Sequence, residues 1–449
     1  MFVRNLKYRS KCRSEQTNYY LKKMKIKNQF YNEFDTECFE GKRKADYRTP
    51  FEIDRDRVIH TFAFRKLQSK TQVFLPGEYD FYRTRLTHSI EVAQIGRSIC
   101  TFINRTSDEL NEKDFYIDPK LVEAVCLTHD IGHPPFGHAG ERKLNQLLKK
   151  YGGFEGNAQT LHEITENIYS TIYKRKGFNP TRAYVDGVLK YKRLHKSFKK
   201  SPKNHFLYDE QKKYVDFVFD KKQIPSNLSA NEKLNNFKSL ECEIMDWSDD
   251  IAFSINDIID GITAGFLNRE RVERWFKGKD DNFKEINVDF FRNLLNVFKT
   301  EQITRIGSIK MGDFIKSAKL IKRNNFMSRK TNRYKYALLI DDKFKSESKF
   351  YKTLALELIF ELPQIKQLEF KGEIIIENLF NTFVENYCSA KNYKNLLPRE
   401  YERWINESKN NKEKILLIRD YIAGMTDRYA IKIYNRMFMP DSGSILDLV

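Results

Sequence analysis

The chain has 449 residues, of which 40% are hydrophobic and 14% aromatic, a composition that excludes an intrinsically disordered polypeptide. Gly and Pro number only 19 and 11, which argues against collagen-like and turn-rich all-β folds, and no apolar run approaches the roughly 18 residues of a membrane-spanning helix. The 80 Lys and Arg residues against 61 Asp and Glu give a formal net charge of +19. This surplus favours polyanionic partners such as nucleotides, nucleic acid or an anionic membrane; a solvated Lys-rich surface is the alternative.

Composition along the chain predicts three parts. Residues 1–45 are a basic lead-in that lacks the apolar core and cleavage site of a secretory signal. Residues 46–268 form a helical core with a basic excursion at about 190–227. Its first part, 190–203, carries seven Lys and Arg residues and no acid, which predicts an exposed loop. In 269–449 apolar and Lys-rich stretches alternate at helical spacing, which predicts a further helical region.

Helical periodicity dominates the whole chain, so the predicted fold class is mainly α. A few short runs could be strands, such as 335–341. The six cysteines form no CxxC pair, and their spacing matches neither a zinc ribbon nor a disulfide framework. We therefore expect free thiols in a reducing cytoplasm.

The histidines are concentrated in one quarter of the chain, and six of the eight lie between residues 60 and 162. Apolar residues follow His88 at +4, +7 and +11 and precede His129 by four and seven, so both histidines lie on apolar helix stripes. Asp130 comes directly after the second one, and a buried ionised carboxylate needs a compensating charge. This arrangement indicates a metal site or an acid–base site; a cluster of structural histidines is the alternative.

A second acidic cluster lies far downstream, in 241–261. On a helix, Asp249 shares a face with the apolar residues Met245 and Ala252, whereas Asp250 lies on an adjacent stripe with further acids. Asp249 is therefore the better candidate for a buried metal ligand. A solvated acidic helix face is the alternative.

The order His88, His129-Asp130, Asp249 resembles the metal-binding signature of the HD-domain phosphohydrolases. The flanking sequence is more specific, because six blocks in order between about Arg48 and Ala430 resemble the dGTPase-type deoxynucleoside triphosphate triphosphohydrolases. These blocks are FRKLQSKTQVF (64–74), RTRLTHSIEVAQIGR (83–97), LTHDIGHPPFGHAGE (127–141), GGFEGNAQT (152–160), SDDIAFSINDIIDG (248–261) and DYIAGMTDRYA (420–430).

This resemblance implies that 46–268 is an HD-domain catalytic core. His88, His129, Asp130 and Asp249 would hold one divalent ion per chain, and two imidazoles suit Mn, Fe, Co, Ni or Zn better than Mg. The implied reaction is hydrolysis of dGTP or another deoxynucleoside triphosphate (dNTP) to a deoxynucleoside and tripolyphosphate. By their place in HPPFGHAGE, His138 and Glu141 match the catalytic pair of the family. His138 would donate a proton to the leaving 5′ oxygen or steer the water, and Glu141 would orient the His138 imidazole.

Substrate contacts are also expected from these blocks. Cationic side chains are expected to bind the polyphosphate, and polar side chains are expected to contact the sugar and base. Alternatively, the cationic residues are surface charges and the polar residues cap helices. The candidate substrate-binding residues are Arg57, Arg65, Lys70, Arg85, Asn157, Gln159 and Asp257, the last for the sugar 3′-hydroxyl. The family commonly has Tyr at the position of Phe253, so this chain lacks one hydroxyl contact, and its substrate range is open.

Two other functions compete with this one: a different HD phosphohydrolase, such as a 5′-nucleotidase or cyclic-nucleotide phosphodiesterase, and a non-catalytic nucleic-acid-binding protein. The resemblance implies homo-oligomers and an effector, single-stranded DNA or a dNTP. The segment 190–203 is the predicted nucleic-acid contact.

Overall fold

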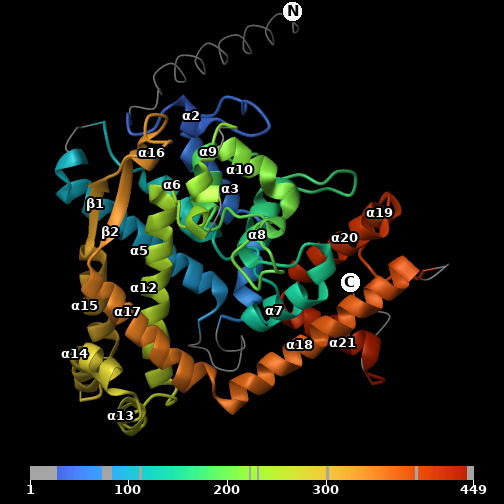
Figure 1. The fold of residues 1–449 in the computed structure, drawn as a ribbon. Coiled ribbons are helices and arrows are strands. Elements are labelled where there is room, and N and C mark those ends of the chain that lie inside the picture. The colour runs from blue at the N-terminus through green and yellow to red at the C-terminus, as the bar shows by residue number, and fades with distance from the viewer. Residues whose placement is uncertain are drawn as a thin grey trace, which may run out of the picture.

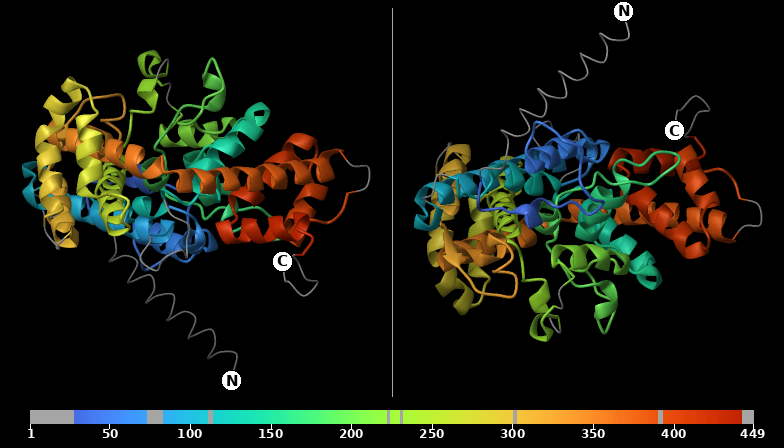
Figure 2. Two further views of the ribbon diagram at one scale, coloured as in Figure 1. Left: turned by 90° about the horizontal axis from the view of Figure 1, so that it is seen from below. Right: turned by 90° about the horizontal axis from the view of Figure 1, so that it is seen from above.

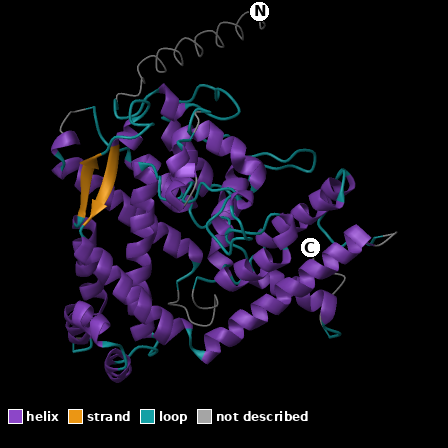
Figure 3. Cartoon of the chain, in the orientation of Figure 1, coloured by secondary structure: helices purple, strands orange, loops and turns teal. Residues whose placement is uncertain are grey.

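The computed structural model describes residues 28–72, 83–110, 114–221, 224–229, 232–299, 303–389 and 393–441. Helices make up most of this part of the chain, which confirms the mainly α prediction (Figure 3). The strands β1 (Ala318–Lys322) and β2 (Tyr336–Ile340) pair antiparallel, so the short run expected at 335–341 is a strand. No helix of the described ranges is both long enough and apolar enough to cross a membrane.

The helices of the described residues follow one another along the chain in the order of their labels. Those of eight or more residues are α3 (Pro50–Ile59), α5 (Arg85–Thr106), α6 (Pro119–Thr128), α7 (Gly137–Leu147), α12 (Leu240–Thr263), α13 (Arg269–Lys277), α14 (Asp281–Val297), α15 (Ile303–Lys316), α17 (Asp342–Ala355), α18 (Pro363–Val384), α19 (Arg399–Asn406), α20 (Asn411–Ala423) and α21 (Asp427–Phe438). The shorter α-helices are α2 (Glu33–Thr36), α4 (Phe62–Lys66), α8 (Gly156–His162), α9 (Arg182–Val188), α10 (Lys212–Val218), α11 (Ser226–Ser229) and α16 (Asn332–Lys335).

Helices α5, α6 and α12 pack against one another and form the centre of the fold. Local sequence fixes where two of them begin. Thr84 accepts a hydrogen bond from the N–H of Thr87 and caps α5, and Asp118 caps α6 ahead of a proline in the first helical position. The chain leaves α6 at its His-Asp pair and starts α7 only at Gly137, because two prolines lie between.

Two hydrophobic clusters form the core, and both cross the boundary predicted at 268/269. The first contains residues from Phe30 to Ile365, and the second joins α7 to α18, α20 and α21. Figures 1 and 2 show β1, β2 and α13–α15 at one end of the molecule and α18–α21 at the other, with α17 and α18 leading from one end to the other. The core also begins before the boundary predicted at 45/46, since Phe30 is fully buried. Both boundaries stay sequence-based predictions; residues 1–27 lie outside the described residues.

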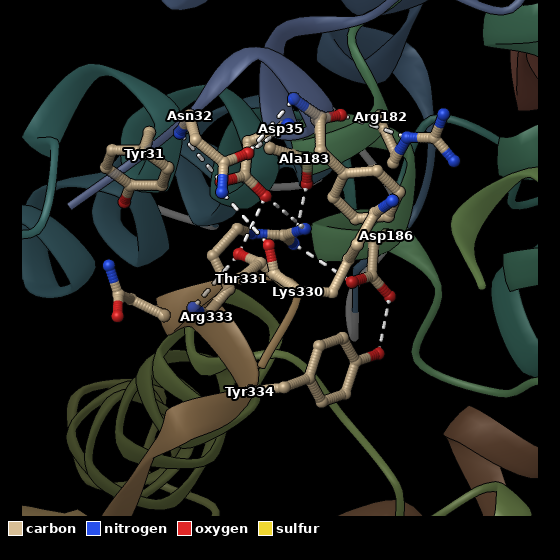
Figure 4. Close-up of polar contacts among 12 residues, drawn as sticks. Tyr31, Asn32, Asp35, Arg182, Ala183, Asp186, Lys330, Thr331, Arg333 and Tyr334 are labelled. Atoms are coloured by element: carbon tan, nitrogen blue, oxygen red, sulfur yellow. Dashed lines mark hydrogen bonds and ion pairs between the residues drawn. The ribbon is translucent and has the colours of Figure 1, made fainter. Parts of the chain in front are cut away.

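A buried ion network fastens the α16 segment to the rest of the core (Figure 4). Arg333 is 1% exposed and contacts a carboxylate oxygen of Asp186 at 3.1 Å. It also contacts a carboxylate oxygen of Glu241 at 2.9 Å. The Tyr334 hydroxyl donates to Asp186 at 3.0 Å, and the hydroxyl of Thr331 donates to an acid on α2 at 2.8 Å. Removing one member would leave an uncompensated buried charge, so the network holds α2, α9, α12 and α16 together.

Candidate metal centre and active-site cavity

Four side chains from three elements converge beside the centre of the fold. His88 lies on α5, His129 and Asp130 follow α6, and Asp249 lies on α12; all four are buried. His88 Nε2 is 3.2 Å from Asp249 Oδ1, and His129 Nε2 is 3.6 Å from the Oδ1 atoms of both aspartates. The structure therefore brings together the four residues that the sequence predicts as metal ligands.

The hydrogen bonds around His129 fit a metal ion. Its Nδ1 lies 2.7 Å from the carbonyl oxygen of Cys126, which requires the proton on Nδ1 and leaves a lone pair on Nε2. That Nε2 atom is buried without a hydrogen-bond partner among the described residues, and it faces two carboxylate oxygens. A lone pair and two carboxylates pointing at one another need a cation between them.

Electrostatics keep the central carboxylate ionised. Burial alone would raise the pKa of Asp130, but the positive charge around it, including the Arg85 guanidinium in contact with it, outweighs burial and holds the pKa well below its usual value. Burial also holds the pKa of His133 well below its usual value. An ionised carboxylate is the protonation state that binds a metal ion.

A cavity of about 380 Å³ opens beside this cluster. Eight of the predicted site residues line it: Arg85, His129, Asp130, His138, Glu141, Asn157, Asp249 and Asp257. The cavity is therefore where the predicted catalytic pair, several predicted substrate contacts and the candidate metal ligands meet.

Arg85 presents unused hydrogen-bond donors in this cavity. Its Nη1 donates to Asp130 Oδ2 at 2.7 Å, whereas its Nε and Nη2 have no partner among the described residues, although the side chain is 1% exposed. Gly137 has φ +57°, and a Cβ at that position would lie 3.2 Å from Arg85 Nη2. A side chain there would crowd the guanidinium, so the glycine keeps space around donors that suit an anionic oxygen.

The predicted catalytic pair lies on the first turn of α7. His138 is exposed to the cavity, and Glu141 accepts a hydrogen bond from the N–H of Gly156 at 2.7 Å. The imidazole rings of His133 and His138 are 5.9 Å apart. Burial, together with the carboxyl of Glu141, raises the pKa of the neighbouring Glu155 to about 8. Glu155 is therefore a group in this corner of the cavity that can exchange a proton near neutral pH.

Two residues of α12 extend the cavity wall beyond the metal cluster. The ring of Phe253 lies 4.9 Å from the ring of His88 and gives this wall an apolar surface. Burial raises the pKa of Asp257 to about 7, so this carboxyl can donate as well as accept a hydrogen bond.

The other four predicted substrate residues do not line this cavity among the described residues. Arg57 donates to the carbonyl of Phe178, and Arg65 is exposed, with its guanidinium 4.5 Å from the ring centre of Phe62. Gln159 is fully buried and bonded to neighbouring polar side chains, among them an acid at 3.2 Å. The charged or polar groups of Arg57, Arg65 and Gln159 therefore contact other residues of the protein.

Lys70 belongs to the block 64–74 that resembles the family, but its ammonium group contacts the protein backbone. Its ammonium group is buried and donates to the carbonyls of His133 and, at 3.0 Å, Ala423, the last residue of α20. Burial lowers the pKa of Lys70 to about 7. Carbonyls at a helix C-terminus attract cations, so Lys70 joins α20 to the loop after the His-Asp pair.

Residues that sequence reasoning did not assign complete the cavity. Lys190 and Tyr191, at the start of the basic excursion, line the cavity. Lys352 and Phe360, which follow the predicted 268/269 boundary in the sequence, line it as well. Lys190 Nζ lies 3.4 Å from Asp249 Oδ2. The only signal in the sequence was the density of cations after residue 190.

The expectation that 190–203 forms one exposed loop is wrong for its first residues. The side chain of Lys192 is 0% exposed, whereas Lys196, Lys199 and Lys200 are exposed as predicted. The physical reason is that Lys192 finds a buried carboxylate 3.3 Å away, which compensates its charge inside the protein.

Comparisons with known proteins agree with this geometry. The HD domain family model matches residues 85–251, a range that contains all four candidate metal ligands, and the phosphohydrolase-associated domain model matches 338–436. The deoxyguanosinetriphosphate triphosphohydrolase-like protein of Shewanella halifaxensis (strain HAW-EB4) is 33% identical over 441 residues, covering 90% of this chain and 96% of that protein. Deoxyguanosinetriphosphate triphosphohydrolase-like protein 2 of Deinococcus radiodurans is 34% identical over 435 residues, covering 91% and 96%.

Proposed function

Because the chain belongs to the deoxyguanosinetriphosphate triphosphohydrolase-like family of HD-domain phosphohydrolases, we propose that it hydrolyses dNTPs to deoxynucleoside and tripolyphosphate. The observation that carries the proposal is the pairing of two unsatisfied groups in one cavity. Among the described residues, the lone pair of His129 Nε2 has no hydrogen-bond partner and faces two carboxylates, and two N–H donors of Arg85 lack partners beside Asp130, one of these carboxylates. The first group needs a cation, and the second needs an anion.

His88, His129, Asp130 and Asp249 would hold one divalent ion. When bound, such an ion polarises the α-phosphate and lowers the pKa of water. Two imidazoles and two carboxylates favour Mn, Fe, Co, Ni or Zn over Mg.

The protein's own groups would bind and orient the substrate. Arg85, Lys190 and Lys352 supply positive charge along the cavity for the polyphosphate, and Asp257 and Asn157 offer polar contacts to sugar or base. The P–O bond to the 5′ oxygen breaks as the oxygen of water bonds to the α-phosphorus. His138 would give a proton to the leaving 5′ oxygen, and Glu141 would orient that imidazole.

The test is incubation of the purified protein with each dNTP and, separately, with a deoxynucleoside monophosphate and a cyclic nucleotide, in the presence of Mn or Mg. Chromatography then resolves deoxynucleoside, tripolyphosphate, pyrophosphate and orthophosphate. We expect deoxynucleoside and tripolyphosphate in equal amounts from at least one dNTP. Orthophosphate from the monophosphate, or opening of the cyclic nucleotide, with no tripolyphosphate from any dNTP would favour the other HD phosphohydrolases.

The exposed part of the basic excursion supports a second proposal, binding of single-stranded DNA or RNA. Lys196, Lys199 and Lys200 are exposed, and the Asn145 side chain on α7 fixes the loop by donating to the carbonyl of Lys203 at 2.8 Å. Neutralising the three lysines together should weaken binding and flatten its salt dependence, because fewer counterions are released. Hydrolysis without DNA should stay unchanged, since the three side chains lie outside the cavity lining among the described residues.

Membership of the family is the sole basis for proposing a dNTP effector and homo-oligomers. A dNTP effector would raise the initial rate for a second dNTP above the additive value. Homo-oligomers would appear as a multiple of the 53.5 kDa chain in sedimentation equilibrium.

A further inference from the structure

One wall of the active-site cavity is built from two segments that lie far apart along the excursion. The rings of Tyr191 and His205 stack with centroids 4.3 Å apart and an interplanar angle of 24°, and both residues line the cavity. Their neighbours Lys190 and Asn204 line it as well. The exposed basic loop lies between the two segments. Their backbones pair just beyond the stacked rings, where the N–H of Leu207 donates to the carbonyl of Arg193 at 2.7 Å and the N–H of His195 donates to the carbonyl of Leu207 at 2.8 Å.

A single buried side chain outside the cavity contacts both segments. Asn235 is 8% exposed, and its Oδ1 accepts hydrogen bonds from the backbone N–H groups of Lys192 and Arg193, each at 2.9 Å. Its Nδ2 donates to the backbone carbonyl of His205 at 2.9 Å. One amide therefore joins the backbone that follows Tyr191 to the backbone of its stacking partner.

The two segments do not depend on Asn235 equally. Lys192 has a second anchor, because its buried ammonium lies 3.3 Å from Asp186 Oδ1, and Asp186 belongs to the Arg333 network drawn in Figure 4. His205, by contrast, is exposed and has φ +64°, a left-handed conformation that a non-glycine residue adopts only when its surroundings impose it. The bond from Asn235 to its carbonyl is one such constraint.

We propose that Asn235 is a positioning residue for substrate binding: it holds His205 against Tyr191 and so fixes the wall that carries Lys190. This inference rests on the proposed function, because it treats the cavity as the polyphosphate site. Asn235 does not contact the cavity itself among its described lining residues. Its removal should therefore weaken binding of substrate more than it slows turnover.

The primary test is Asn235→Ala, with initial rates of tripolyphosphate release measured across dNTP concentrations. We expect KM to rise about tenfold, the scale of losing one or two hydrogen bonds, while kcat changes less than about threefold. If Asn235→Ala fails to fold, Asn235→Asp serves instead, since it keeps both acceptor contacts and loses only the donor to His205; KM should still rise. An unchanged KM in the folded variant overturns the proposal.

Asn28→Ala is the matched control. Asn28 is 4% exposed and also makes three backbone hydrogen bonds, donating to the Tyr116 carbonyl at 2.8 Å and accepting from the N–H groups of Phe30 and Tyr116. Neither Asn28 nor its two partners line the cavity among the described residues. We expect a comparable loss of thermal stability with wild-type KM; an equal rise in KM would show that Asn235 acts through general stability.

A double-mutant cycle separates positioning from a merely local effect. In a Tyr191→Ala background the wall is already disrupted, so adding Asn235→Ala should raise KM by less than about twofold. Fully multiplicative effects would overturn the proposal.

Calorimetric titration with inorganic tripolyphosphate repeats the comparison without turnover. If the wild type releases no tripolyphosphate from any dNTP, the proposed function fails, while weaker tripolyphosphate binding by Asn235→Ala would still support the positioning role.

Discussion

Arg85→Lys should lower kcat/KM for the preferred dNTP by roughly 10- to 150-fold while leaving the metal content unchanged. In the structure Arg85 uses Nη1 for Asp130 and keeps Nε and Nη2 free of partners among the described residues. A lysine retains the charge and can keep the contact to Asp130, but it loses the planar fork of donors. A hydrogen bond to a charged group contributes about 1.5–3 kcal/mol, and loss of one such bond in the transition state gives the range above.

The assay is the initial rate of tripolyphosphate release, with metal per chain measured by mass spectrometry on the same preparations. Arg97→Lys is the matched control, since Arg97 lies on the same helix, is 54% exposed and pairs only loosely with Glu123 at 3.7 Å. We expect wild-type kinetics from it. Wild-type kcat/KM in Arg85→Lys would refute the reasoning about its free donors, and loss of metal would show that Arg85 acts through Asp130 instead.

Three further outcomes follow from the site. Asp130→Asn should reduce bound transition metal from about one ion per chain to near none, as measured by mass spectrometry; equal metal content in wild type and variant would reject the ligand assignment. His138→Ala should keep the metal and the melting temperature but lower kcat by roughly 10²–10⁴, and a rate above about a third of wild type would remove its role as proton donor. Glu155 holds a proton in the fold that the unfolded chain releases near its ordinary pKa of 4.5, so the free energy of unfolding falls as pH rises towards about 8. Urea unfolding of Glu155→Gln at pH 5 and pH 8 should show a smaller fall than wild type.

Much of the metal centre could be predicted from the sequence, because its signal is local. His88 and His129 each lie on an apolar stripe of a single helix, and such a stripe faces the core wherever the helix packs. Asp249 could be chosen over its neighbour Asp250 by the same rule. In the structure Asp249 is 7% exposed, whereas Asp250 is only partly buried and pairs with Lys352.

The lysines of the cavity could not be predicted in the same way as Arg85. Lys190 and Lys70 both belong to polar, Lys-containing segments, yet the first reaches Asp249 and the second bonds backbone carbonyls at the end of α20. Which partner a lysine finds depends on packing between segments that lie far apart in the chain, and no spacing rule encodes it. Asn235 is the hardest of these residues to predict, because nothing in the sequence around this loop asparagine indicates its three contacts with the backbone.

The packing of helices across the predicted 268/269 boundary could not be predicted from the sequence for a related reason. Alternating apolar and Lys-rich stretches correctly predict helices after residue 269, but amphipathic helices do not reveal their partners. Helix α17 packs on α12, and α18 packs along α7, so Lys352 and Phe360 reach the cavity from the predicted C-terminal helical region.

The most direct measurement of the central claim is hydrolysis of dGTP and the other dNTPs in ¹⁸O-labelled water, with and without Mn, with the products resolved by mass spectrometry. Attack of water on the α-phosphorus predicts metal-dependent formation of tripolyphosphate that carries one ¹⁸O atom and an unlabelled deoxynucleoside. Label in the deoxynucleoside, formation of deoxynucleoside monophosphate and pyrophosphate, or the absence of any metal-dependent product would contradict it.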